Sequence, residues 1–415
     1  MWRRLLANPR LRGLFLFLSV AGPGIITSNV DNDAGGIATY SMAGAHFGYN
    51  LLWSLLPIML ALIIVQEMSS RMGVVTGKGL SDLIRERFGV KITVYLLIAL
   101  VLTNFGNVIA EFAGVASSLE IFHVSKYVSV PVAAVLVWLL VVKGTYRSVE
   151  KVFLYACVFY VTYIVAGFLA KPDWAAVGGT LVAPSFKLSS ESLGMIVGLV
   201  GTTIAPWMQF YLQAAIVEKN VAAKDYKWSR LDVIIGSIVV TVVAGFIILT
   251  CAATLFKAGI RVETAADAAQ ALRPLAGRYC AALFAFGLLN ASLFAASILP
   301  LSTAFVVCEA MGWENGVDKK FSEAPQFYGL YTMLILFGGG IILLPKIPLF
   351  PVMYVSQVLN GVVLPVLLVF MILLINNKKL MGEHVNGLVY NAVSWATVAV
   401  LGGLSLVYIG SLLGL

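Results

Sequence analysis

The sequence predicts an all-α polytopic membrane protein, built as a five-plus-five inverted repeat of spans with an eleventh helix added. Composition supports the membrane assignment, because 60% of the 415 residues are hydrophobic, 12% are charged and the mean hydropathy is +0.94. A soluble domain carries roughly twice that charged fraction. The repeat is predicted from the number of apolar windows and from two irregular stretches inside them.

Apolar windows of about 20 residues, the length that crosses a bilayer as a helix, recur along the chain. We place them at 14–45, 50–70, 92–122, 128–142, 151–170, 192–217, 232–256, 279–311, 327–344, 350–375 and 387–413. They form a single transport domain, with repeat one at about 14–170, repeat two at about 192–375 and the extra span at about 387–413.

Basic residues are unevenly divided between the two sides of the predicted spans. If the N-terminus is cytoplasmic, the inner loops carry 20 of the 28 lysines and arginines. This bias follows the positive-inside rule, so we expect a cytoplasmic N-terminus and an outer C-terminus. The net charge of +8 then reflects membrane topology rather than a nucleic-acid partner. We expect an integral protein of a prokaryotic plasma membrane.

The first window contains GPGIITSNVDNDAGG at 22–36, with four glycines, a proline, two asparagines and two aspartates. These residues weaken a helix, and hydrocarbon does not accept unpaired carboxylates. Apolar residues continue on both sides of the stretch. We therefore expect a helix broken near the bilayer midplane, with freed carbonyls and acidic side chains around a hydrated site. The alternative is a kinked helix end whose aspartates lie in water.

The sixth window contains a second irregular stretch, GLVGTTIAPWMQ at 198–209. Pro206 cannot donate a backbone hydrogen bond, and the glycines and threonines before it already weaken the helix. One proline break in a membrane helix is common. Interrupted helices at corresponding positions, spans one and six, are much rarer and indicate an inverted repeat with a binding site between them.

Polar side chains in other windows are further candidates. Glu111 lies deep in the third window, where an unpaired carboxylate is costly, so it faces a cavity or a partner, or is held protonated. A structural hydrogen bond and a role in the ion path are both open to it. Gln357 and Asn360, in the tenth window, could offer amide oxygens to a cation or bond neighbouring helices together. All three histidines lie near loops or span ends: His46, His123 and His384.

Motifs along nearly the whole chain resemble one known family. They are GPG at 22–24 with an aspartate at the break, AGAHFGYNLLW at 43–53, QEMSSRMGVVTG at 66–77 and RERF at 85–88. They continue with Ala110-Glu111, YLQAAIV at 211–217, SQVLN at 356–360 and KLMG at 379–382. The chain resembles the NRAMP divalent-metal transporters. The resemblance implies a LeuT-type inverted-repeat fold with eleven or twelve spans.

NRAMP proteins bind metal through a D-P-G-N motif in the first helix, and the resemblance implies that Asp33 is its aspartate. Ala34-Gly35-Gly36 replaces P-G-N, so Gly36 lacks the asparagine ligand, for which Asp31 or Asn32 could compensate. The family's sixth helix carries A-x-x-M-P-H and a further histidine. The matching residues here are Thr202, Ala205, Pro206, Trp207 and, for the further histidine, Gln213.

These departures change the expected substrate. A thioether favours Mn, Fe and similar ions, because hard cations gain little from sulfur, and Ala205 removes it. Mg²⁺ usually keeps several waters around one or two carboxylates, so a wider site suits it. The expected ligands are all oxygens: Asp33, Asp31, the Thr202 and Ala205 carbonyls, and Gln357 as a candidate closing ligand. The pattern is similar to the NRAMP-related magnesium transporters. Mg²⁺ or Mn²⁺ is then the substrate, and no cofactor is expected.

The family's proton path is largely missing. The histidines of the sixth helix are replaced, and Val108 stands where the third helix usually has an aspartate, which leaves Glu111 alone. We therefore expect uncoupled uptake by alternating access, with residues 31–36 and 202–207 as hinges or gates. For a divalent cation, 100 mV supplies about 2 × 2.3 kcal/mol.

Other functions compete with this prediction. In the same fold, the chain could be a proton-coupled Mn²⁺/Fe²⁺ transporter or a sodium-coupled symporter of a small organic solute. Two acidic residues at the break favour a cation over an organic anion. A channel would also show uncoupled flow. No Ser/His, HExxH or paired-carboxylate motif supports a membrane-embedded enzyme. The expected partners are the metal ion and the lipid bilayer, with no obligatory protein partner.

Overall fold

Eight helices in the described part of the chain have the length and apolar composition needed to cross a membrane. The computed structural model describes residues 23–143, 161–183 and 189–414. The long helices, with the shorter apolar α8, are α5 (Leu55–Thr76), α7 (Val90–Glu120), α8 (Lys126–Val142), α12 (Ser190–Thr203) continued by α13 (Pro206–Glu218), α14 (Tyr226–Cys251), α17 (Cys280–Met311), α18 (Pro325–Ile342), α19 (Leu349–Ile375) and α21 (Leu388–Leu412). They coincide with nine of the predicted windows, and the all-α membrane fold is confirmed.

The first and fifth predicted windows are described only in part. The first appears from residue 23 onward as α3 (Pro23–Val30) and α4 (Ala34–Phe47), and the fifth from residue 161 onward as α10 (Val161–Leu169). Residues 14–22 and 151–160 of these windows lie outside the described residues, as do Arg147 and the basic residues predicted near the N-terminus.

Both predicted helix breaks are present. Residues 31–33 separate α3 from α4, and residues 204–205 separate α12 from α13. Pro206 takes the first position of α13, where its missing N–H group is not needed. Because Pro206 cannot donate, the carbonyl of Thr202 has no helical donor four residues further on.

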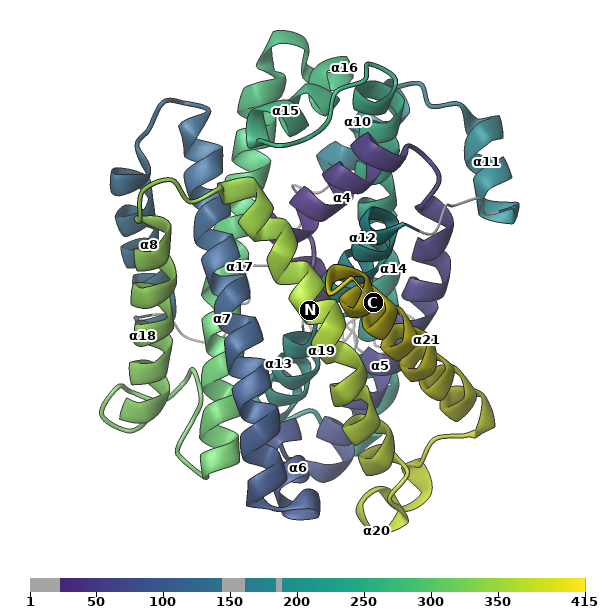
Figure 1. Ribbon diagram of the computed structural model, residues 1–415. Helices are drawn as coiled ribbons and strands as arrows, with labels where there is room; N and C mark the ends of the chain where they lie inside the picture. Colours follow the sequence, from purple (N-terminus) through teal and green to yellow (C-terminus); the bar gives the residue numbers. More distant parts are fainter. Residues whose placement is uncertain (1–22, 144–160, 184–188, 415) are drawn as a thin grey trace, which may run out of the picture.

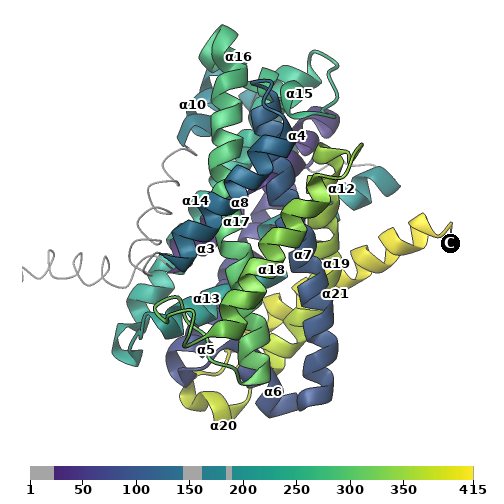
Figure 2. The ribbon, with the colours of Figure 1, turned by 90° about the vertical axis from the view of Figure 1, so that its left-hand side faces the viewer.

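The helices around the breaks approach one another at backbone distance. A Cβ atom on Gly201 of α12 would lie 2.0 Å from the carbonyl oxygen of Gln357 on α19, and one on Gly361 would lie 2.3 Å from the carbonyl oxygen of Val197. Small residues allow this approach, which is typical of packed membrane helices. Figure 2 shows α21 leaning out of the bundle, and only 17% of its apolar window is buried.

The two ends of the bundle differ in loop structure. The short helices α6 (Leu80–Phe88) and α20 (Lys378–Met381) lie together at one end, in segments that the sequence analysis places inside the cell (Figure 1). The opposite end carries the loop helices α11 (Trp174–Val182), α15 (Ala265–Ala269) and α16 (Arg273–Ala276), which the apolar windows did not predict.

A buried ion pair joins three segments toward the α6 and α20 end. Arg71 on α5 donates to Glu67 one turn earlier at 3.0 Å and to Asn386, before α21, at 2.5 Å. Tyr226, at the start of α14, donates to the other carboxylate oxygen of Glu67. Both charges are therefore hydrogen-bonded, which buried ions require.

Candidate cation site between the two broken helices

The candidate site is built around the first turn of α4. Asp33 is the N-cap of this helix, and its carboxylate accepts a hydrogen bond from the Gly36 N–H at 2.6 Å. Glu111 of α7 accepts from the Ala34 N–H at 3.2 Å. The unpaired N–H groups of a helix N-terminus stabilise negative charge, so one helix end holds both carboxylates.

Two glycines in that turn allow neighbouring elements to reach it. A Cβ atom on Gly36 would lie 2.2 Å from the Asp31 carbonyl oxygen and 3.2 Å from Thr202 Oγ1. One on Gly35 would lie 1.8 Å from Gln357 Nε2. The turn therefore touches both breaks and α19 at once, and a larger side chain at either glycine would push them apart.

Tyr40 connects the two broken helices. Its hydroxyl lies 2.8 Å from Thr203 Oγ1, at the end of α12, and 3.3 Å from a carboxylate oxygen of Asp31. Tyr40 is fully buried on α4, two turns beyond Asp33. Sequence reasoning missed this residue, and its helical spacing from Asp33 is the signal that could have identified it.

Several buried oxygens at the breaks have no hydrogen-bond donor. They are Asp31 Oδ1, Glu111 Oε1 and Thr202 Oγ1. Their residues are at most 2% exposed, and Asp33 is 3% exposed. Buried acceptors normally have partners, so this set can accept a cation or its water ligands.

Gln357 is oriented by other amides. Its side-chain oxygen accepts from Asn360 at 2.9 Å, while Asn360 and Asn107 exchange two hydrogen bonds of 3.0 Å between α19 and α7. Asn360 therefore bonds helices together. Gln357 reaches the first turn of α4, but its amide oxygen is already engaged.

The other predicted residues divide into two groups. Asn32 and Ala205 lie buried in the breaks, and Trp207 is buried on α13, where its carbonyl accepts from Ser302 at 3.1 Å. Gln213 lies two turns along α13 and donates to the Lys78 carbonyl at 2.9 Å, so the structure does not bring it to the breaks.

Val108, which stands where the family's third helix usually has an aspartate, has apolar surroundings. Val108 lies one turn before Glu111 and contacts α18, where a Cβ atom on Gly338 would lie 2.7 Å from Val108 Cγ1. Among the residues that the structure describes, no group of three or more His, Cys, Asp and Glu side chains is arranged to hold a metal ion. Ion binding at the breaks would therefore depend on hydroxyl, carbonyl or water oxygens beside the carboxylates.

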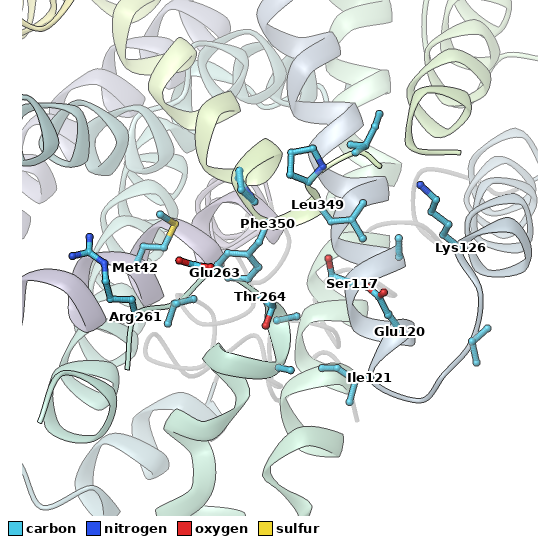
Figure 3. A pocket seen from close by; sticks show the side chains of 18 of the residues that line it. Met42, Ser117, Glu120, Ile121, Lys126, Arg261, Glu263, Thr264, Leu349 and Phe350 are labelled. Carbon is cyan, nitrogen blue, oxygen red and sulfur yellow. The ribbon is translucent and has the colours of Figure 1, made fainter. Parts of the chain in front are cut away.

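A cavity of about 1000 Å³ lies at the α15 end and is lined by residues further along α4 and α7 (Figure 3). Met42 and Ser117 line it, nine residues beyond Asp33 on α4 and six residues beyond Glu111 on α7. At 1.5 Å per residue, the cavity begins roughly 10 Å from the carboxylates. Figure 3 shows Glu120 and Glu263 among its charged residues.

A family profile described as natural resistance-associated macrophage protein-like (Nramp) matches residues 24–411. The chain belongs to the Nramp family. It is 31% identical to the divalent metal cation transporter MntH of Ralstonia nicotianae over 409 residues, which cover 92% of this chain and 89% of that protein. Family membership confirms the prediction of a membrane transporter rather than an enzyme.

Solved structures extend the comparison to the fold. The Eremococcus coleocola manganese transporter aligns with a TM-score of 0.77 at 21% identity, covering 95% of this chain and 87% of that chain. Mhp1, a nucleobase-cation-symport-1 family transporter, aligns with a TM-score of 0.61 at 13% identity, covering 94% and 90%. This Nramp protein therefore has the predicted LeuT-type fold.

Proposed function

We propose that this Nramp protein transports hard divalent cations, Mg²⁺ first and Mn²⁺ as well, through the site between its two broken helices. The observation that carries the proposal is the set of buried, donor-free oxygens of Asp31, Glu111 and Thr202 beside the capping carboxylate of Asp33. Relatives named as divalent metal cation transporters and manganese transporters support a divalent substrate.

The preference for Mg²⁺ rests on the absence of sulfur among these ligands. Ala205 takes the place where the family's methionine is usual, and oxygen ligands suit Mg²⁺ and Mn²⁺ alike. A methyl side chain also leaves space for water on the ion. A partly hydrated Mg²⁺ needs only one or two carboxylates, which Asp33 and Asp31 supply.

Uncoupled, voltage-driven entry is the second part of the proposal. This part assumes the orientation predicted from the basic residues, with the N-terminus and the α6 and α20 end in the cytoplasm and the C-terminus outside. The 1000 Å³ cavity is then the outer vestibule. Val108 and Gln213 do not titrate, so the predicted proton path beyond the site is lost, and Asp33 is the acidic neighbour that Glu111 keeps. The inner-negative potential then drives the cation through alternating access, with the two breaks as hinges.

Uptake into proteoliposomes tests both parts. Purified protein with and without Asp33→Ala would be supplied with Mg²⁺ or Mn²⁺ at set membrane potentials, while internal pH is recorded. We expect Mg²⁺ entry that follows the potential, moves no protons and is lost in the variant. Mn²⁺ entry with internal acidification and no Mg²⁺ entry would contradict the proposal and favour the proton-coupled alternative.

A further inference from the structure

Asp232 of α14 holds the N-terminus of α3. Its Oδ2 accepts the Gly24 N–H at 2.6 Å, and its Oδ1 accepts the Ile25 N–H at 3.4 Å. Asp232 is 1% exposed and lies six residues into α14. These bonds join elements that are about 208 residues apart in the chain and satisfy N–H groups in the first described turn of α3.

The same faces of the two helices touch directly. One turn beyond Asp232 on α14, a Cβ atom on Gly236 would lie 2.8 Å from the Gly24 carbonyl oxygen and 3.0 Å from Ser28 Oγ. Ser28 in turn donates to Gln66 Oε1 on α5 at 3.2 Å. α3 is therefore seated between α14 and α5 by close contacts and directed bonds, and Figure 2 shows it beside α14.

We propose that Asp232 is a positioning residue for transport. It holds α3, which lies on the cytoplasmic side of the first break, in the position that closes the site to the cytoplasm. In this conformation the carboxylates at the break are buried and the large cavity lies on the other side. Opening toward the cytoplasm requires α3 to leave α14. The Asp232 bonds to Gly24 and Ile25 break in that step, and the bonds to Glu111 and Gly36 at the first turn of α4 do not.

The inference rests on the alternating access of the proposed function. It adds a contact that sets the equilibrium between the conformation closed to the cytoplasm and the one open to it. Losing hydrogen bonds to a charged acceptor shifts an equilibrium by roughly tenfold or more. Asp232→Ala therefore favours the conformation open to the cytoplasm. Asp232→Asn keeps one acceptor oxygen for Gly24 and restores most of the closed population.

Thiol labelling on each side of the membrane tests the inference without any transported ion. In a chain whose four cysteines are replaced by alanine, Gln209→Cys reports on the cytoplasmic side, because Gln209 is fully buried on α13 in the inner half of the bundle. Ser117→Cys reports on the outer cavity. A membrane-impermeant maleimide would be applied to intact cells and to inverted vesicles.

We expect Asp232→Ala to raise cytoplasmic labelling at position 209 roughly tenfold and to lower outer labelling at position 117. Thr241→Ala is the matched control, because Thr241 lies on the same helix and its hydroxyl donates to the Ser237 carbonyl within that helix. Gly236→Ala, which wedges α3 away without altering Asp232, should act in the same direction as Asp232→Ala.

Unchanged labelling at both reporters in folded Asp232→Ala protein would overturn the inference. Equal increases from both sides with a lower melting temperature would also overturn it, since that pattern marks a general loss of stability. The labelling test can be told apart from the test of the proposed function. Mg²⁺ uptake could fail while the labelling still shifts, or uptake could be present while the labelling stays unchanged.

Discussion

Glu111 Oε2 accepts a hydrogen bond of 3.2 Å from the backbone N–H of Ala34, the first residue of α4. A carboxylate from the third span is thereby bonded to the helix that starts at the first break. Its second oxygen has no donor and is buried. Glu111 is thus anchored to α4 by one oxygen, and its carboxyl group lies against that of Asp33.

This arrangement predicts different outcomes for two substitutions. Glu111→Gln keeps an oxygen for Ala34 but removes the negative charge, so we expect normal folding and cation uptake reduced about tenfold or more, the effect of losing about 1.4 kcal/mol of binding. Glu111→Ala also leaves the Ala34 N–H without its acceptor and should lower thermal stability. Uptake and melting temperature measured together separate the two effects. Wild-type uptake by Glu111→Gln would remove this residue from the ion path.

Restoring sulfur at the second break should change selectivity. We expect Ala205→Met to raise the preference for Mn²⁺ over Mg²⁺ about tenfold in competition uptake, because a thioether binds the softer ion better. Ala205→Leu is the control, since it adds similar bulk without sulfur. Equal effects of the two variants would show that space, and not ligand softness, decides selectivity at this position.

A side chain at Gly35 should displace the amide of Gln357. A Cβ atom there lies 1.8 Å from Gln357 Nε2, so Gly35→Ala should lower uptake by moving that side chain. Adding Gln357→Ala should recover part of it, because the clash is with a side chain. Gly106→Ala on α7 is the control, since its Cβ atom would have no neighbour within 4 Å. Failure of the double variant to recover any uptake in folded protein would assign Gln357 a direct role.

For Gly201 we expect that a change of the Gln357 side chain does not restore uptake. Its Cβ atom would lie 2.0 Å from the Gln357 carbonyl oxygen and 2.3 Å from the Gly361 nitrogen, which are backbone atoms. Gly201→Ala should therefore lose uptake, and no change of the Gln357 side chain should restore it. Uptake assays of the single variant and of its combination with Gln357→Ala check this. Recovery would mean that α12 and α19 can separate.

The buried ion pair predicts a large change in stability. Glu67→Ala leaves Arg71 without its carboxylate, and breaking such a pair costs about 3–5 kcal/mol. The thermal unfolding temperature in detergent should fall markedly, with a smaller fall for Glu67→Gln. Lys78→Ala, which removes an exposed ion pair with Glu86, should change stability by roughly 0–1 kcal/mol. Similar losses in the two alanine variants would contradict the difference in burial.

Sequence reasoning predicted the span positions and both breaks, because apolar length, proline and clustered small residues are local signals. It also identified Asp33, Glu111 and Thr202, which the fold brings together at the first turn of α4. It did not predict Tyr40 or Asp232, whose partners lie across the bundle at Thr203 and Gly24. Gln213 was matched by resemblance to the family's further histidine, and the structure places it two turns along α13, bonded to the Lys78 carbonyl.

The loop helices α11, α15 and α16 were also not predicted. They are short, and two of them have only four or five residues, so they present no periodic pattern long enough to identify. The engagement of the Gln357 oxygen by Asn360 could not be predicted either, since it requires the register between α7 and α19.

The glycine contacts around the breaks have a consequence for how this protein can diversify. At positions 201 and 361 a single added methyl group meets backbone atoms of another segment at 2.3 Å or less, so random mutagenesis should find almost no surviving variants there. Position 205 already carries a methyl group, which is buried at the second break. We therefore expect substrate range to change through a single substitution at Ala205 while these glycines stay unchanged. A laboratory selection for growth on Mn²⁺ or Mg²⁺ should yield substitutions at position 205.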